Sequence, residues 1–328
     1  MDQESQPQEQ NPNQNFEAKI IKPKKSFKQT VYDFYDKKYK ILLVIPFLML
    51  AISLAILGFK FATTGEIIPR DVSLKGGVIL TIPYQGDFDS ESLESYLSSK
   101  FSQNDVGVRV LKDFGRSIGI IVEADIIPEN EQIDLLMAEV GNNLGIDIST
   151  TEYGLETVGS SLGESFFNEA LKALLIAFVF MGLVIFIYFR TIVPSVAIIL
   201  AAVSDMVVAL AVINIFQIKI GTAGIAAFLM LIGYSVDTDV LLTVRVLKRK
   251  EGTVMDRIMS SVNTGMTMTL TGIVAIIIAL LVTQSEIIKQ IMLILLIGLL
   301  ADLVNTWIQN VGLLRLYIER RRKKGKPI

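Results

Sequence analysis

The chain has 328 residues, of which 51% are hydrophobic and 20% charged, with 31 basic and 33 acidic side chains. It contains neither Cys nor His, which excludes disulfides, thiolate metal sites and thiol nucleophiles and removes the commonest metal ligand. Any proton chemistry in this protein must therefore use carboxyl groups.

The first 40 residues are polar and lack the periodicity of a folded element. Residues 1–18 are rich in Gln, Asn, Glu and Pro, a composition typical of disordered segments. Residues 19–40 carry eight Lys side chains ahead of the first apolar run. Because an anionic leaflet attracts each such Lys by roughly 1 kcal/mol, we expect residues 1–40 to form a basic cytoplasmic segment next to the membrane.

Six apolar runs follow, each near the roughly 20 residues that cross a hydrocarbon core of about 30 Å. The first predicts a transmembrane helix over 41–61, and its position favours an uncleaved anchor over a signal peptide. The other five predict a five-helix bundle over 170–314, followed by a basic tail over 315–328. The runs cover residues 41–59, 173–189, 193–216, 221–242, 265–282 and 291–313.

Basic residues indicate the orientation of the six helices, because Lys and Arg are enriched in cytoplasmic loops. The amino-terminal segment, the turn at Arg190, the loop between the fourth and fifth helices and the basic tail all fall on one side. The short loops on the other side, 217–220 and 283–287, carry only Lys219. We therefore expect a multi-pass protein of the cytoplasmic membrane, with both termini in the cytoplasm and residues 62–169 outside.

The loop over residues 62–169 contains 19 acidic and 6 basic residues and has the pattern of a small folded domain. Its elements alternate as strand, helix, strand, strand, helix, strand, which is the order of a ferredoxin-like α+β fold. About 108 residues is enough for one such domain. The predicted strands are 77–83, 106–114, 117–123 and 146–153, and the predicted helices are 90–101 and 129–144.

Four carboxyl groups lie inside the predicted membrane helices, where ionisable groups cost about 2.5–3.5 kcal/mol to insert, and the sixth helix adds the amide of Asn305. Asp205, Asp302 and Asn305 lie in the third and sixth helices, and Asp237 and Asp239 lie in the fourth. We interpret these five residues as candidates for a proton relay. The alternative is that they are hydrogen-bonded contacts that hold helices together, each contributing about 0.6–2 kcal/mol.

Several motifs in these segments resemble those of the SecF family of protein-export subunits, in the same order over nearly the whole chain after residue 40. Gly76 and Gly77 lie in a segment like the family's Asp-Phe-x-Gly-Gly, and residues 158–163 are similar to its Val-Gly-x-x-x-Gly. The third helix has Asp205 where the family has Asp. The most specific similarity lies in the fourth helix, where the family reads Gly-Tyr-Ser-Ile-Asn-Asp-Thr-Val-Val-Val-Phe-Asp-Arg. Residues 233–245 correspond to this motif, at positions that include Gly233, Tyr234, Ser235, Thr238 and Arg245.

The chain departs from the bacterial pattern at three places, and the combination resembles an archaeal branch of the family. The family's central Asp in the fourth helix is Thr238 here, flanked by Asp237 and Asp239. The Arg of the family's fifth helix is missing from residues 264–269, and Asp302 in the sixth helix is an addition. The resemblance therefore implies that any coupling to the proton gradient uses carboxyl groups at other positions.

The resemblance implies a six-helix half of an RND-like fold and an accessory role in late steps of protein export. Its expected partners are a SecD-like subunit in a heterodimer, the Sec translocon channel, the exported polypeptide and the lipid bilayer, with no nucleic acid. It implies no enzymatic activity, no cofactor and no metal. The alternative is an RND-type small-molecule or lipid transporter acting as an oligomer, because Asp237 and Asp239 also resemble a Val-Asp-Asp motif of those pumps. Such pumps usually have twelve spans.

Overall fold

A computed structural model describes residues 35, 38–85, 88–113, 116–249 and 251–325 of the chain. One compact unit begins at Tyr39 and holds all the elements described below. The predicted disordered tail 1–18 and nearly all of the basic stretch 19–40 lie outside the described residues, as does the end of the predicted basic tail, 326–328.

Six helices of the described chain are long and apolar enough to cross a membrane, which confirms the predicted number of spans. The sixth is a composite in which two α-helices are joined by a π-helical turn. The protein is therefore a multi-pass α-helical membrane protein. The spans are α2 (Val44–Thr64), α6 (Ser160–Phe189), α7 (Ile192–Ile215), α8 (Thr222–Lys248), α9 (Val254–Val282) and the composite of α10 (Glu286–Val304), η2 (Asn305–Asn310) and α11 (Val311–Lys323).

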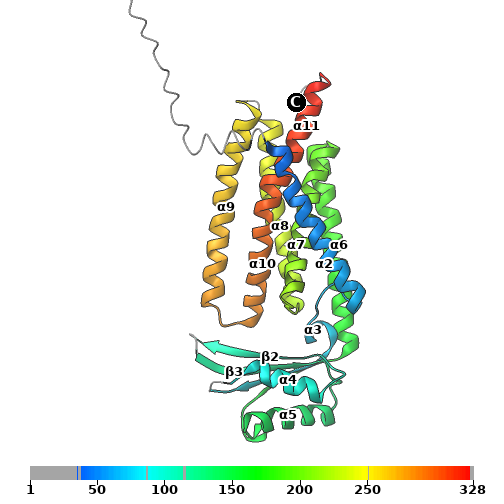
Figure 1. The fold of residues 1–328 in the computed structure, drawn as a ribbon, viewed down its shortest axis with the longest axis vertical. Helices are drawn as coiled ribbons and strands as arrows, with labels where there is room; N and C mark the ends of the chain where they lie inside the picture. Colours follow the sequence, from blue (N-terminus) through cyan, green and yellow to red (C-terminus); the bar gives the residue numbers. More distant parts are fainter. Residues whose placement is uncertain (1–34, 36–37, 86–87, 114–115, 250, 326–328) are drawn as a thin grey trace, which may run out of the picture. The chain divides into compact units, whose positions relative to one another are not determined.

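Helix α8 lies inside the helical bundle and packs against α6, α7, α9 and α10 (Figure 1). Its Phe228 and Leu231 are buried together with Ile213 of α7 and Ile294 of α10. Helices α2, α6 and α9 instead expose many large apolar side chains, as helices that face lipid do. Polar side chains on the inner face of α8 are consequently kept away from the hydrocarbon.

The segment between α2 and α6 folds into a four-stranded antiparallel sheet with two helices, which confirms the predicted α+β domain. The strand order is β2-β3-β1-β4, as in a ferredoxin-like fold. Helices α4 and α5 cover the face of the sheet that is turned away from the bundle (Figure 1). The core of this α+β domain includes Leu80, Leu97, Ile120 and Leu136. The elements are α3 (Val72–Lys75), β1 (Gly77–Pro83), α4 (Ser90–Lys100), β2 (Val106–Asp113), β3 (Arg116–Ala124), α5 (Asn130–Leu144), η1 (Ile148–Thr150) and β4 (Gly154–Val158).

The prediction of a final strand over residues 146–153 is wrong. Helix α5 ends at Gly145 in the left-handed conformation (φ 66°), and a 3₁₀ turn follows at Ile148–Thr150. The strand that completes the sheet is β4 at Gly154–Val158, which pairs antiparallel with β1. Because β4 is an edge strand with mostly exposed side chains, its sequence lacks the alternating apolar pattern that would have revealed it.

Two membrane helices extend beyond the apolar runs that predicted them. Helix α6 begins at Ser160, whereas the bundle was expected from residue 170, and α11 continues to Lys323, whereas a tail was expected from residue 315. Hydropathy marks only the part of a helix that crosses hydrocarbon, while the backbone hydrogen bonds of a helix continue through polar residues on either side. The domain boundary therefore lies at the start of α6.

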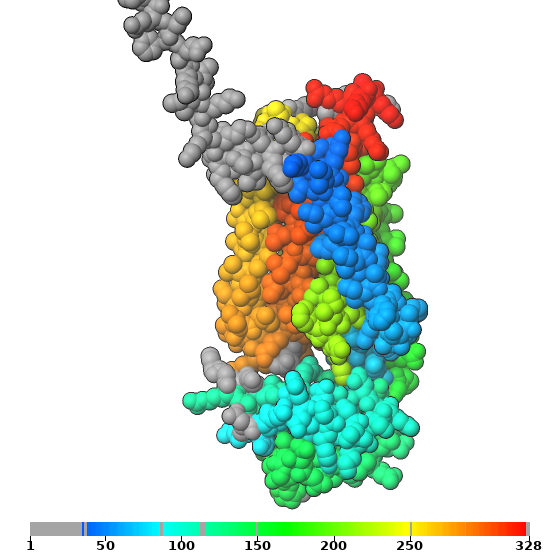
Figure 2. Space-filling view, viewed as in Figure 1, coloured from blue at the N-terminus to red at the C-terminus, as the bar shows by residue number. Residues whose placement is uncertain are grey.

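The sheet domain is fastened to the bundle where the segment after α2 meets the loop between α7 and α8. Asn214 Nδ2 donates to Ile67 O at 2.9 Å, and Ile220 N donates to Pro69 O at 2.6 Å. The backbone of Asp71 then donates to Ile220 O at 3.0 Å. Figure 2 shows the cyan sheet domain against the yellow-green end of α7. A displacement of this loop would therefore be transmitted directly to the sheet domain.

Candidate functional site

Asp205 lies in the middle of α7 with its side chain fully buried. One carboxyl oxygen accepts a hydrogen bond from Ser235 Oγ of α8 at 2.6 Å, and the other accepts from Asn305 Nδ2 of η2 at 2.7 Å. Both oxygens therefore have partners, as buried polar atoms in folded proteins generally do. The consequence is that α7, α8 and the sixth span meet at one carboxyl group.

Asp302 is buried in α10, just before the π-helical turn. Its Oδ1 accepts a hydrogen bond from Thr306 Oγ1 at 2.8 Å, and its Oδ2 makes no hydrogen bond of normal geometry with the described residues. The carboxyl group is close enough to Asp205 and Asp239 to interact electrostatically with both. Carboxyl groups that interact this way titrate together, so the charge of one depends on the charge of the others.

Asp239 is buried in α8 and completes the cluster. Its Oδ1 accepts a hydrogen bond from Asn310 Nδ2 at 2.7 Å, and within the described part of the chain its Oδ2 lacks a partner. Helices α7, α8 and α10 thus each contribute one carboxyl group to a single buried site. We call Asp205, Asp239 and Asp302 the carboxyl cluster.

The π-helical turn η2 supplies both amides and one of the two hydroxyls that donate to the carboxyl cluster, the other hydroxyl being that of Ser235. Its Asn305, Thr306, Gln309 and Asn310 are all fully buried. In a π-helix the backbone bonds run from residue i to i+5, so residues five apart come closer on one face than they do in an α-helix. Asn305 can therefore bind Asp205 while Asn310 binds Asp239. Single π turns within α-helices are frequent at functional sites.

Asp237 was predicted as a candidate for the same relay, but its side chain does not join the carboxyl cluster. It lies on an exposed part of α8 and lines a cavity of about 260 Å³ together with Tyr234, Thr238 and Met268 of α9. Residues two apart on an α-helix differ by about 200° around the axis. Only one member of the pair Asp237 and Asp239 can therefore face α7 and α10, and the structure selects Asp239.

The other residues of the family-like motif have different surroundings. Ser235 and Thr238 are buried, whereas Tyr234 is half exposed and Gly233 is exposed. Arg245 lies two turns beyond the cluster and donates from its guanidinium to Ser260 O and to Thr264 Oγ1 of α9, both at 2.8 Å. Arg245 thus fastens α8 to α9 rather than contacting the carboxyl groups.

Gly76 and Gly77 lie far from the cluster, where the sheet domain joins α6. Both have positive φ angles, 91° and 134°, which favour glycine. Their role is therefore in the connection between the domains.

Sequence reasoning missed Thr306, Asn310 and Ser204 as members of the site. Gln309 Nε2 donates to Ser204 Oγ at 3.4 Å, which adds a second contact between η2 and α7. The available signal was the polar content of Asn-Thr-Trp-Ile-Gln-Asn at 305–310 within an otherwise apolar run. Among the described residues, no group of three or more His, Cys, Asp and Glu side chains is arranged to hold a metal ion.

Comparisons with known proteins agree with one another. Residues 139–320 match the family described as protein export membrane protein SecD/SecF, C-terminal. The chain is 36% identical over 294 residues to the protein-export membrane protein SecF of Methanocaldococcus jannaschii, which covers 88% of this chain and 99% of that protein. It is 39% identical over 275 residues to the protein of the same name from Thermococcus gammatolerans, which covers 83% of this chain and 84% of that protein.

The fold is also similar to a solved structure, that of SecDF, a translocon-associated membrane protein from Thermus thermophilus. The TM-score is 0.65 at 18% sequence identity, over 87% of this chain. The chain spans only 38% of the length of that SecDF chain. At this level of identity the similarity concerns the fold alone.

Proposed function

We propose that this chain, which belongs to the SecF family of protein-export membrane proteins, is an accessory subunit of the Sec protein translocase. The observation that carries the proposal is a similarity that covers 88% of this chain and 99% of a SecF relative. The six spans and the SecDF-like fold support it. In this role the protein assists the transport of polypeptides across or into the cytoplasmic membrane and catalyses no reaction itself.

The proposed partner is a SecD-like subunit that forms a heterodimer with this chain beside the translocon channel. The length of the solved SecDF chain supports a second subunit, because this chain accounts for only 38% of it. The distribution of Lys and Arg supports an orientation with both termini in the cytoplasm and the sheet domain outside. The exported polypeptide would then meet the sheet domain on the outer side of the membrane.

The proposed energy source is the proton gradient, acting on the carboxyl cluster. Buried ionisable side chains inside membrane bundles mark proton or ion pathways, and two oxygens of this cluster make no hydrogen bond with the described residues. A change of charge on Asp205 or Asp239 would alter hydrogen bonds that join different helices. The resulting shift of α7 and α8 would reach the sheet domain through the loop that contains Ile220.

Affinity purification of the tagged chain from its native membrane in mild detergent tests the assignment. We expect a SecD-like subunit to be recovered with it, and recovery of the translocon channel would extend the complex. A tagged membrane protein of unrelated fold, purified in parallel, controls for non-specific recovery. Purification of the chain only with copies of itself would contradict the proposal and favour an RND-type transporter.

A second measurement separates the two functions in cells. Depletion of the protein should slow the appearance of newly made exported proteins outside the membrane in a pulse-chase experiment, and expression of the intact chain should restore it. Normal export combined with impaired efflux of a small molecule would favour the transporter instead.

A further inference from the structure

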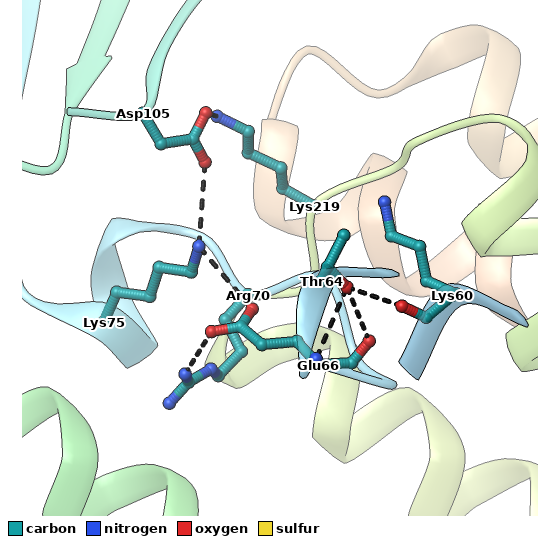
Figure 3. A network of polar contacts seen from close by, with 7 residues as sticks. All are labelled: Lys60, Thr64, Glu66, Arg70, Lys75, Asp105 and Lys219. Carbon is teal, nitrogen blue, oxygen red and sulfur yellow. Dashed lines mark hydrogen bonds and ion pairs between the residues drawn. The ribbon is translucent and has the colours of Figure 1, made fainter. Parts of the chain in front are cut away.

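Four basic side chains from three separate parts of the chain gather where the sheet domain meets the bundle. Lys60 comes from the end of α2, Arg70 and Lys75 come from the segment that leads into the sheet, and Lys219 comes from the α7–α8 loop (Figure 3). The sheet domain as a whole is acidic, with 19 acidic and 6 basic residues over 62–169. A gathering of cations at one point of such a surface calls for a specific explanation.

Two carboxylates neutralise only part of this charge. Asp105 lies 2.9 Å from Lys219 Nζ and 3.8 Å from Lys75 Nζ. Glu66 lies 2.6 Å from a guanidinium nitrogen of Arg70 and 3.6 Å from Lys75 Nζ. Four cations therefore face two anions, which leaves a net charge of +2.

Of the four cations, the ammonium group of Lys60 is the one that pairs with neither Glu66 nor Asp105. Lys60 is half buried, and its Nζ forms no hydrogen bond or ion pair with any residue that the structure describes. Figure 3 shows the ammonium group beside the network without a contact to it. A ligand anion could therefore approach Lys60 without displacing an existing partner.

These side chains line a cavity of about 360 Å³, which also includes Asn214 and Gln217. Pockets for small ligands occupy about 300–1,000 Å³, so the cavity has room for a phosphate group with a small polar substituent. Asn214 is buried, and its Oδ1 has no hydrogen-bond partner among the described residues. This orphaned acceptor requires a donor such as a hydroxyl group.

The cavity lies at the boundary between the membrane helices and the sheet domain, because α2 ends at Thr64 and α7 ends at Ile215. Large apolar side chains are exposed next to it in the sequence, at Phe59, Phe61 and Phe216. Lipid headgroups lie at this level of a bilayer, and exposed aromatic residues there contact acyl chains. This combination fits a lipid better than a soluble ion.

We propose that this cavity binds the phosphate headgroup of an anionic phospholipid, with Lys60 and Lys219 facing the phosphate and Asn214 accepting from a headgroup hydroxyl. A headgroup with hydroxyl groups, such as phosphoglycerol, satisfies both the excess charge and the orphaned acceptor. The bound lipid would stabilise the contact between the sheet domain and the bundle, because Lys219 also binds Asp105 of the sheet domain. The site is independent of the export role.

Thermal unfolding of the purified full chain in a neutral detergent tests the site. The chain is titrated with dioctanoyl phosphatidylglycerol, with dioctanoyl phosphatidylcholine and with inorganic phosphate. We expect phosphatidylglycerol to raise the unfolding temperature. Lys60→Gln should raise the lipid concentration needed for half of this effect about fivefold, as expected from one Lys facing an anionic lipid.

Two variants serve as controls. Arg116→Gln removes a positive charge from an exposed position of β3 in the sheet domain, outside the residues that line the cavity, and should respond as the unchanged chain does. Lys60→Arg keeps the charge and should bind as well. Since only the backbone carbonyl of Lys60 has polar partners among the described residues, and its Nζ has none, substitution of the side chain should leave the fold intact.

An equal response of Lys60→Gln and the unchanged chain would overturn the proposal, and so would an equal response to phosphatidylcholine. A response to inorganic phosphate as strong as that to phosphatidylglycerol would assign the site to a free anion and overturn the lipid assignment.

Discussion

Gly163 of α6 lies against Gly76 of the sheet domain so closely that a Cβ on Gly163 would be 2.7 Å from the backbone nitrogen of Gly76. The relationship is mutual, since a Cβ on Gly76 would be 2.4 Å from Ser160 Cα. The two glycine motifs, which are far apart in the sequence, therefore meet in one contact. They fix the start of the second membrane helix, α6, against the residues that lead into β1 of the sheet domain.

Gly163→Ala should destabilise the protein, because the three atoms nearest to its Cβ would all belong to the backbone and cannot rotate away. We expect a loss of about 1–3 kcal/mol, as in other overpacked sites. Thermal unfolding of the purified full chain measures it. Gly58→Ala in α2 is the matched control, since its Cβ would meet nothing within 4 Å. Equal unfolding temperatures of the two variants would show that the contact contributes nothing.

The hydrogen bond from Asn310 to Asp239 should stabilise the bundle, and a double exchange tests it. Asn310→Ala removes the described partner of Asp239 Oδ1 and should cost about 1–3 kcal/mol. Combining Asp239→Asn with Asn310→Asp restores one amide and one carboxyl group at this contact. We expect the double variant to unfold at a higher temperature than Asn310→Asp alone.

Additive losses in the double variant would contradict the prediction, because residues that do not interact show additive effects.

Under the proposed coupling to the proton gradient, Asp239→Asn should abolish the proton-dependent part of export while preserving the fold. The amide has the shape of the carboxyl group and can still accept from Asn310 Nδ2, but it cannot release a proton. We expect the export rate in membrane vesicles to fall to the rate measured after the proton gradient is collapsed. Asp237→Asn is the control, because the Asp237 side chain lies outside the carboxyl cluster. Equal export by the two variants would exclude Asp239 from coupling.

The number of spans and the fold of the sheet domain could be predicted because each depends on local patterns. Apolar runs of membrane length identified the helices, and a short apolar run rich in β-branched residues identified β1 at Gly77–Pro83. β4 could not be found in this way, because an exposed edge strand is held by its backbone bonds to β1 and needs no apolar side chains.

The site was only partly predictable for a related reason. The positions of Asp205, Asp239 and Asp302 in apolar runs indicated that they would be buried, and all three are. Which side chains they bind depends on the rotation of each helix, and the π-helical turn changes that rotation within the sixth span. The pairing of Asn310 with Asp239 therefore follows from tertiary packing and not from the spacing of residues.

The contact between Tyr96 and Glu139 should make the stability of the sheet domain depend on pH. Tyr96 Oη donates to Glu139 Oε2 at 2.5 Å and joins α4 to α5, and Lys100 Nζ lies 3.4 Å from the other oxygen of Glu139. The hydrogen bond from Tyr96 and the charge of Lys100 lower the pKa of Glu139 below its ordinary value of 4.5. The same bond to Glu139 raises the pKa of Tyr96 above 10.0.

A carboxyl group whose pKa is lower in the folded state adds stability above its unfolded pKa, and this stability is lost as the pH falls through the folded value. A phenol whose pKa is raised adds stability below pH 10.0, and it is lost as the pH rises further. The pair should therefore stabilise the protein at neutral pH.

We expect Tyr96→Phe to unfold at a lower temperature than the unchanged chain at pH 7, with the difference disappearing as the pH falls below 4.5. Tyr84→Phe, at a tyrosine that packs edge-on against Phe88, should show no such dependence. A difference for Tyr96→Phe that stays constant from neutral to acidic pH would mean that the hydroxyl acts without the charge of Glu139.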